Sequence, residues 1–355
     1  MSSPVTKSMK LGMIAAQQGE AGSCGGKRGI MLVSIIVPAY NAATTVGECI
    51  QACLDQTHAS TEVIVIDDGS TDDTAAVAQS FPISYIHQEN RGPAAARNHG
   101  ARVAFGKIVA FTDADCVPDP DWIESLLRGF EEGTVAVGGT YGIRNESSLL
   151  ARLIHEEIVL RHKNFSGTVD FLGSFNVAYQ KEAFEKAGGF DESFPIASAE
   201  DNDLAYRLQD AGGELRFTPD ARVAHYHPTK LWPYLRTQLQ HGYWRMKLYA
   251  KHPRRSNGDR YAGLGDFLGP PLSLLLLASL VALPLIDQSY FIIAIVLFAL
   301  SYGALTAKFD RNIARRLGTV SGIAFRSMTI LRDLARGIGL IGGVWTFFVM
   351  RKGTV

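Results

Sequence analysis

The stretch VIVIDDGSTDDT, residues 63–74, joins a run of β-branched residues to a dense acidic turn. Residues 62–66 predict a buried strand, and the segment from Thr71 to about Ser80 predicts a helix. Asp67 and Asp68 therefore stand at the carboxyl end of the strand. Neighbouring side chains of a strand point to opposite faces, so these two carboxylates are poorly placed to share one ion. We expect them to have separate roles in one site.

The same alternation of strand and helix continues on both sides of this stretch. MLVSIIVPAYN (31–41), residues 83–88 and residues 107–120 predict three further strands. Helices are expected between and after them, at about 45–56 with Thr45 and Glu48 as a capping box, at 92–106 and at 120–131. Four alternations with short connections are typical of a doubly wound α/β domain with a mostly parallel sheet. Ligands bind such sheets at the carboxyl ends of the strands.

A second acidic pair, Asp113-Ala114-Asp115, ends the fourth predicted strand. In an extended segment both carboxylates would point the same way, and two hard oxygen donors suit Mg²⁺ or Mn²⁺ bridging a substrate diphosphate. An Asx-type turn into the next helix is the structural alternative. The chain has no G-x-G-x-x-G after the first strand and no P-loop motif, which disfavours a dinucleotide dehydrogenase and a P-loop NTPase. The negative charge of a bound phosphate would then have to be balanced by a metal ion and by Arg91 or Arg97.

Two further clusters follow in the second half of the domain. Glu200 and Asp201 lie in the first turn of a predicted helix, where they either stabilise its N-terminus or supply a general base. His225 and His227 in RVAHYHP (222–228) lie on one side of a predicted strand. They could ligate a metal, contact a diphosphate or be buried structural histidines.

Together these pieces resemble glycosyltransferase family 2, whose members have the GT-A nucleotide-sugar fold. The matching segments are VSIIVPAYN (33–41), VIVIDDGSTDDT (63–74), NRGPAAARNHG (90–100), FTDADCVP (111–118), GGFDESF (188–194) and EDNDLAYRL (200–208). Their order and spacing match across roughly residues 31–230, so the resemblance implies a GT-A catalytic domain over that range. It also implies an inverting transfer of a sugar from a UDP-, GDP- or dTDP-sugar donor.

The resemblance further implies roles for individual residues. Donor binding is expected from Pro38, Tyr40, Asp67, Asp68, Arg97 and Asp113. Of these, Pro38, Tyr40 and Asp68 would hold the nucleobase and ribose, and Asp67 would support the loop. Asp115 would ligate the metal directly, and Asp113 would lie near the ribose and the metal. His225, which is considered from its strand position and not from the resemblance, is the further expected metal ligand. Asp201 matches the family's catalytic base, with Glu200 as the second choice.

Departures from the family pattern limit the classes of acceptor that we expect. Processive polymerising members carry a Q-x-x-R-W signature, and QLQHGYWRMKL (238–248) does not reproduce it, so we expect one sugar per encounter. Polyprenyl-phosphate sugar synthases usually lack the Glu-Asp base element, so its presence favours a hydroxyl acceptor on a lipid-linked glycan or glycolipid. A polyprenyl-phosphate glycosyltransferase and a non-catalytic nucleotide-sugar-binding scaffold remain the alternatives.

The C-terminal region, residues 266–355, predicts a membrane attachment. Residues 267–286 and 288–307 are uncharged and long enough to span a bilayer, whereas 337–350 is shorter and is either an interfacial or re-entrant helix or a third span. Arginine and lysine flank the first two segments on their outer sides only, which predicts a multi-pass protein of the cytoplasmic (inner) membrane with its catalytic domain in the cytoplasm. Residues 231–265 are expected to form a helix that lies on membrane lipid or docks on the domain.

Composition limits the remaining choices. Lys and Arg total 35, as do Asp and Glu, so the chain has no excess of positive charge. We therefore do not expect nucleic acid as a partner. The four cysteines match no disulfide or zinc framework and are expected to be reduced thiols. Residues 1–30 lack a hydrophobic period and predict a disordered leader.

Overall fold

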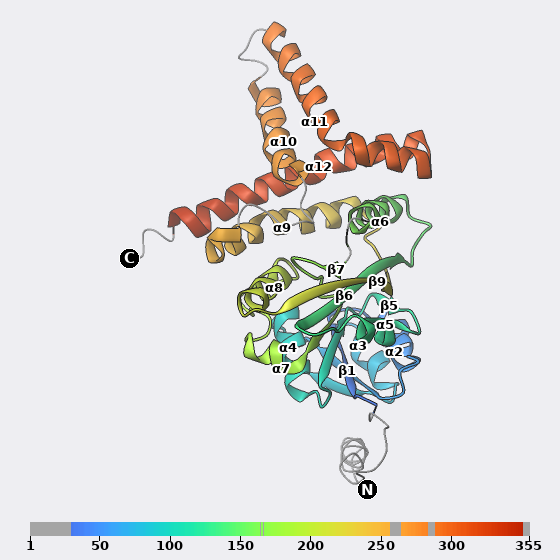
Figure 1. The fold of residues 1–355 in the computed structure, drawn as a ribbon. Coiled ribbons are helices and arrows are strands. Elements are labelled where there is room, and N and C mark those ends of the chain that lie inside the picture. Colours follow the sequence, from blue (N-terminus) through green and yellow to red (C-terminus); the bar gives the residue numbers. More distant parts are fainter. Residues whose placement is uncertain (1–29, 164, 166, 256–263, 283–287, 351–355) are drawn as a thin grey trace, which may run out of the picture.

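The computed structural model describes residues 30–163, 165, 167–255, 264–282 and 288–350. The expected disordered leader, residues 1–30, lies outside this range except for Ile30. In the described part, an α/β domain is followed by four long helices that gather at one end of it (Figure 1).

One half of the sheet has the predicted parallel arrangement. Strands β1 (Val33–Ala39), β2 (Thr61–Asp67), β3 (Ser84–His87) and β4 (Ile108–Thr112) stand in the order β3-β2-β1-β4. Helices α2 (Val46–Leu54), α3 (Thr74–Gln79) and α4 (Pro93–Val103) connect them. All three pairings are parallel. Strands β1, β2 and β4 are mostly buried, as expected for strands that are covered on both faces, whereas the edge strand β3 is partly exposed. Two separate clusters of buried apolar side chains contain the core of this domain.

The other half of the sheet is mixed, which the sequence did not indicate. Its strands are β5 (Cys116–Pro118), β6 (Thr134–Ile143), β7 (Gly167–Thr168), β8 (Asn176–Gln180) and β9 (Glu214–His225). Strand β8 pairs antiparallel with both β4 and β6, β9 runs parallel to β6, and β5 runs antiparallel to β9. The domain is therefore a mixed α/β sheet rather than a mostly parallel one.

The predicted fourth strand, residues 107–120, is divided in two. Strand β4 ends at Thr112, and the backbone N–H of Cys116 donates to the carbonyl of Asp113 at 3.0 Å to close a turn. Strand β5 then begins and pairs with β9 instead. The expectation of an extended Asp113-Ala114-Asp115 segment is wrong, because the chain turns there to reach a different strand.

The capping box expected at the start of α2 does not form. Thr45 is the N-cap residue, but its side chain makes no capping hydrogen bond. Glu48 instead forms an ion pair with Arg144 and accepts a hydrogen bond from the hydroxyl of Tyr226 at 2.6 Å. Charged and hydroxyl partners from distant strands outcompete the backbone N–H that the local pattern had suggested.

Further helices cover the domain and its end. They are α5 (Trp122–Arg128), α6 (Leu149–His162), α7 (Lys181–Lys186) and α8 (Glu200–Asp210). Helix α8 begins at Glu200, where the acidic cluster had placed a helix start. Helix α6 lies at the end of the domain that faces the C-terminal helices (Figure 1).

The C-terminal helices form two layers with different directions (Figure 1). Helices α9 (Leu231–Lys251) and α12 (Thr319–Val344) lie side by side over the end of the domain, with short turns η1 (Pro253–Arg255) and η3 (Trp345–Val349) at their ends. Helices α10 (Leu264–Ala282) and α11 (Gln288–Leu317) project away from the domain as a pair.

Three glycines set the contact between α9 and α12. A Cβ atom added to Gly242 would overlap the carbonyl oxygen of Arg336, and one added to Gly339 would overlap that of Leu239. A Cβ on Gly343 would meet the carbonyl oxygen of Tyr243 at 2.5 Å. The two helix backbones therefore touch directly, as small residues allow.

The expected membrane segments fall on these helices. Among the described residues, one helical segment, Ile292–Leu317, is long and apolar enough to cross a membrane, and Gly265–Val281 is a shorter apolar helix. The predicted spans 267–286 and 288–307 fall on α10 and α11, with 283–287 outside the described residues. The predicted segment 337–350 is the end of α12 together with η3, and α12 lies along α9 instead of projecting with α10 and α11.

Candidate active site

Asp67 holds the loop after β2, as expected. It is fully buried, and one carboxylate oxygen accepts from the backbone N–H of Ser70 at 2.9 Å. The other accepts from the hydroxyl of Tyr85 at 2.6 Å. Burial alone would raise the pKa of Asp67, but the hydrogen bonds from Ser70 and Tyr85 outweigh it and lower the pKa. Asp67 is therefore an ionised structural anchor.

Asp68 points to the other side and holds the loop before α4. Its carboxylate accepts from the side-chain amide of Gln88 at 2.7 Å and from the backbone N–H groups of Arg91 and Gly92 at 2.9 and 2.8 Å. The two neighbouring carboxylates thus have separate partners, as the strand period predicted. Tyr40, at the end of β1, is 53 % exposed beside this edge of the sheet. The contact of Pro38, Tyr40 and Asp68 with a nucleotide stays a prediction.

Arg97 lies behind the site and links its two acidic clusters. Its side chain is only 1 % exposed. The guanidinium donates hydrogen bonds to Asp113 Oδ1 at 2.7 Å and to Glu200 Oε1 at 3.1 Å. Burial alone would lower the pKa of Arg97, but the charges of Asp113 and Glu200 outweigh it and raise the pKa. These two internal ion pairs fix Asp113 relative to the start of α8, and the expected contact of Arg97 with a donor diphosphate stays a prediction.

Glu200 and Asp201 are the two carboxylates at the start of α8. Glu200 is 2 % exposed and accepts from the backbone N–H of Ser198 at 2.6 Å, while Asp201 accepts from the N–H of Asn202 at 2.8 Å. Burial and the adjacent Asp201 raise the pKa of Glu200 to about 7, and burial raises the pKa of Asp201. A carboxylate with a raised pKa is suited to accept a proton near neutral pH. Because Glu200 is engaged by Arg97, Asp201 is the freer of the two.

Asp115, Cys116 and His225 form the one group of metal-ligating side chains found among the described residues. Asp115 Oδ2 lies 3.4 Å from His225 Nε2, and the Nδ1 atoms of His225 and His227 are 3.1 Å apart. Burial would lower the pKa of His225, but Asp115 outweighs it and raises the pKa. A carboxylate beside an imidazole fits Mn²⁺ or Mg²⁺ with few protein ligands. Asp113, the other expected ligand, is directed to Arg97 in this arrangement.

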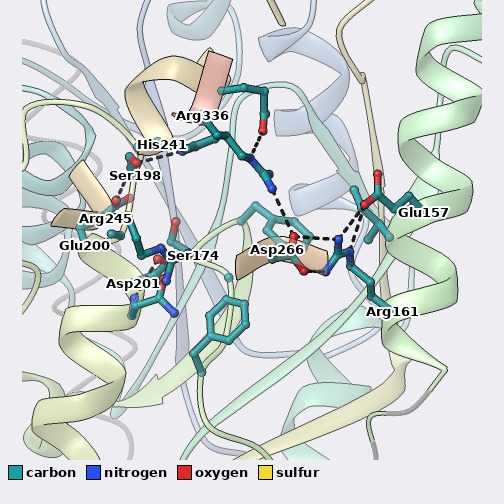
Figure 2. Close-up of a pocket in the computed structure, with 18 of the residues that line it drawn as sticks. Glu157, Arg161, Ser174, Ser198, Glu200, Asp201, His241, Arg245, Asp266 and Arg336 are labelled. Carbon is teal, nitrogen blue, oxygen red and sulfur yellow. Dashed lines mark hydrogen bonds and ion pairs between the residues drawn. The ribbon is translucent and has the colours of Figure 1, made fainter. Parts of the chain in front are cut away.

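A cavity of about 560 Å³ brings the acidic residues together with the C-terminal helices (Figure 2). Asp113, Glu200, Asp201 and His225 line it from the α/β domain. The C-terminal helices contribute Gln238, His241 and Arg245 from α9, Asp266, Phe267 and Pro270 from α10, and Arg332, Arg336 and Leu340 from α12. These residues of the C-terminal helices were not predicted from the sequence to belong to the site. The recurrence of Gln238, His241, Gly242 and Arg245 at helical spacing on α9 was the signal that could have found part of it.

Ion pairs at the roof of the cavity tie α10 and α12 to the domain (Figure 2). Asp266, at the start of α10, accepts two hydrogen bonds from Arg161 of α6 at 2.7 and 3.0 Å and one from Arg336 of α12 at 3.3 Å. Arg332 of α12 pairs with Glu157 of α6 at 2.5 Å. Bidentate and networked pairs of buried groups have defined geometry, so the roof is held in one position.

The α/β domain is similar to known glycosyltransferases. Residues 34–188 match the family model described as glycosyl transferase family 2. The chain is 32 % identical to the pre-mycofactocin glycosyltransferase of Mycobacterium tuberculosis over 241 residues, which cover 63 % of this chain and 49 % of that protein. It is 33 % identical to the validoxylamine A glucosyltransferase of Streptomyces hygroscopicus subsp. jinggangensis over 222 residues, or 52 % of each. The chain therefore spans about half the length of these relatives.

A solved structure has a similar fold. The mannosyltransferase PcManGT from Pyrobaculum calidifontis, solved in complex with GDP-Man and Mn²⁺, aligns with a TM-score of 0.55 over 95 % of this chain and 95 % of that chain. The sequence identity is 19 %, so this likeness concerns the fold. The expected GT-A-like architecture with C-terminal helices is confirmed.

Proposed function

Because residues 34–188 match the glycosyl transferase family 2 model, we propose that the protein transfers a sugar from a nucleoside diphosphate sugar to a hydroxyl group of a membrane-associated glycan or glycolipid. The observation that carries the proposal is the shared cavity. Asp113 at the end of β4 and Glu200 and Asp201 at the start of α8 line it opposite helices α9, α10 and α12. This arrangement supports a reaction in which the sugar donor and an acceptor at a membrane surface share one space.

In the proposed reaction, Asp201 accepts the proton of the acceptor hydroxyl. The hydroxyl oxygen forms a bond to the anomeric carbon from the face opposite the diphosphate. The bond between that carbon and the diphosphate oxygen breaks, and its electron pair leaves with the nucleoside diphosphate. A single displacement of this kind inverts the anomeric configuration. Arg97 keeps Glu200 and Asp113 in place while this happens.

Asp115 and His225 are the residues proposed to hold Mg²⁺ or Mn²⁺, with Asp113 nearby. Their donor atoms lie close enough to share one ion, and the similar mannosyltransferase was solved with Mn²⁺. A divalent cation bound there would offset negative charge on the departing diphosphate. Pro38, Tyr40 and Asp68 are proposed to contact the nucleoside, whose base can be that of a UDP-, GDP- or dTDP-sugar.

We propose that α10 and α11 cross the cytoplasmic membrane, with the α/β domain in the cytoplasm. Helices α9 and α12 would then lie in the interface, and 337–350 would be interfacial rather than a third span. The different directions of the two helix pairs, with α10 and α11 projecting away from the domain, support this (Figure 1). So does the exposed apolar stripe of α12, on which Val320, Ile323 and Ile341 are 78, 65 and 60 % exposed. A reporter inserted between residues 287 and 289 should be extracytoplasmic, and a cytoplasmic reporter would exclude two spans.

Two alternatives make different demands on Asp201. A polyprenyl-phosphate acceptor is already ionised and needs little help from a base, and a non-catalytic scaffold needs neither the base nor a metal. The full-length protein in detergent or nanodiscs would be incubated with Mn²⁺, a panel of UDP-, GDP- and dTDP-sugars and a lipid extract. Release of nucleoside diphosphate and labelling of lipid would be measured.

The hydroxyl-acceptor proposal expects release to be lost in both Asp115→Ala and Asp201→Asn. Asp220→Asn, which changes an exposed carboxylate of β9, is the matched control and should behave like the unmodified protein. Release that survives Asp201→Asn but not Asp115→Ala would support the polyprenyl-phosphate alternative. No release with any donor would contradict an enzymatic function.

A further inference from the structure

The residue directly before the two carboxylates of α8 has an unusual backbone conformation. Ala199 lies in the left-handed region, with φ 71° and ψ 0°, and it is the N-cap residue of α8. Residues other than glycine are strained there, and they stay there only when their surroundings hold them. Something must therefore hold the turn that aims Asp201 into the cavity.

Ser198 supplies two contacts that hold this turn. Its backbone N–H donates to Glu200 Oε2 at 2.6 Å, which closes the turn from within. Its hydroxyl lies 2.9 Å from Nδ1 of His241, a residue of α9 (Figure 2). Ser198 is 5 % exposed, so water cannot easily replace either partner. The strained turn packs against Phe194 and Tyr206 of the α/β domain, and α9 adds the hydrogen bond with His241.

His241 is itself fixed by the packing of α9. The next residue, Gly242, contacts the backbone of Arg336 on α12 so closely that no Cβ atom would fit between them. A hydrogen-bonded path thus runs from α9 through His241, Ser198 and Glu200 to Arg97. Arg97 continues it to Asp113 at the end of β4.

We propose that His241 is a positioning residue, through which α9 holds the strained turn at Ala199 and thereby aims Asp201 at the acceptor. The inference rests on the proposed role of Asp201 as the base. It makes catalysis depend on the docked position of α9, so that the domain is active only while its C-terminal helices are in place.

The test compares four variants of the full-length protein. His241→Phe fills the space but removes the partner of Ser198, whereas His241→Asn retains a polar atom near the position of Nδ1. Ala199→Gly combined with His241→Phe relieves the strain, because glycine adopts positive φ without cost. Lys247→Met is the matched control, because Lys247 also joins α9 to this segment but through Ser193, with Nζ 2.7 Å from Oγ.

We expect His241→Phe to lower kcat about 10- to 100-fold, as a displaced reacting group does, with the KM for donor sugar unchanged. His241→Asn and the Ala199→Gly double variant should each recover at least half of the loss on a logarithmic scale, and Lys247→Met should change kcat less than twofold. Hydrogen exchange of residues 197–203 should be faster in His241→Phe alone, a readout that does not need turnover.

The possible results separate the two proposals. Transfer by the unmodified protein with unchanged kcat and exchange in His241→Phe would overturn the positioning role and leave the proposed function intact. Equal losses in His241→Asn and His241→Phe would also overturn it. No transfer by the unmodified protein would contradict the proposed function, and the exchange measurement would still decide whether His241 holds the turn.

Discussion

Arg97 offers the sharpest test of how the site is held together, through the substitution Arg97→Met. The change leaves Glu200, 2 % exposed, without the guanidinium that now lies 3.1 Å from it. Removing one partner of a buried ion pair costs about 3–5 kcal/mol, because the remaining charge stays buried without compensation. Asp113 is 29 % exposed and can regain water, so we expect the loss to arise mainly from Glu200.

The expected fall in melting temperature follows from this free energy. For a folded unit of about 150–250 residues, each kcal/mol shifts the melting temperature by about 2–4 °C, which gives a fall of about 6–20 °C. The assay is thermal unfolding of the ligand-free protein at several pH values. Arg97→Met/Glu200→Gln is the matched double variant, and it should recover about 1–3 kcal/mol because it removes the uncompensated charge as well.

The pH dependence has a definite sign. The folded pKa of Glu200 is about 7, above its ordinary value, so the folded state loses stability as pH rises from about 4.5 towards 7. Without Arg97 the folded pKa rises further, so the penalty of Arg97→Met should be larger at pH 8 than at pH 5. A variant with an unchanged melting temperature but weakened binding of UDP, GDP or dTDP would refute this reasoning. It would mean that Arg97 faces the donor diphosphate after all.

Three further predictions concern the base and the sheet. Asp201→Asn should lower kcat by about 10²–10⁴-fold. It should not alter the thermal shift produced by the nucleotide, because the proposed base acts only on the acceptor. Weakened nucleotide binding would instead mean that Asp201 contacts the donor. Glu200→Gln should move the acid limb of the pH–rate profile to lower pH, because removing a neighbouring carboxylate lowers the pKa of Asp201. An acid limb at the same pH would mean that a group other than Asp201 sets it. Gly139→Ala should lower the melting temperature by several degrees, because the added Cβ would overlap the carbonyl of Ala221. Gly303→Ala is the control and should not lower it, because Gly303 has open space around it. Equal changes in melting temperature would contradict the close approach of β6 and β9.

The parallel half of the sheet was predictable because each strand is a local apolar run followed by a turn signal. Residues 63–66 and 108–112 lie in the strands that their composition indicated. The mixed half was not, because β8 and β9 take their direction from pairing with strands far away in the sequence. The turn at Asp113–Asp115 follows from the same cause, since β5 leaves β4 to pair with β9.

The site was predictable to the extent that its residues follow strand ends. Asp67, Asp68, Asp113 and His225 were identified from local patterns and lie at or directly after the ends of β2, β4 and β9. Glu200 was identified in the same way as the start of a helix, and it begins α8. The role of Arg97 was not accessible, since nothing in its neighbourhood reveals that a guanidinium on α4 is buried between β4 and α8.

The cavity roof was also beyond local reasoning. Arg161 and Asp266 are separated by 105 positions along the chain, and their contact depends on how the C-terminal helices dock. The hydropathy of residues 266–355 indicated attachment to a membrane, but it carries no information on which charged side chains turn back towards the domain.

The glycines between α9 and α12 have a consequence for substrate size. Gly242, Gly339 and Gly343 let the two backbones touch, and His241 and Arg245 on α9 and Arg336 and Leu340 on α12 look into the same cavity. Gly339 and Gly343 are not among the residues that line the cavity, so its height is governed in part by residues outside the lining. A single methyl group at one of these positions would act as a spacer and change the room available to an acceptor without touching a residue that binds it. In proteins with this architecture, the choice of acceptor can therefore vary through substitutions between two helices, at a distance from the reacting groups.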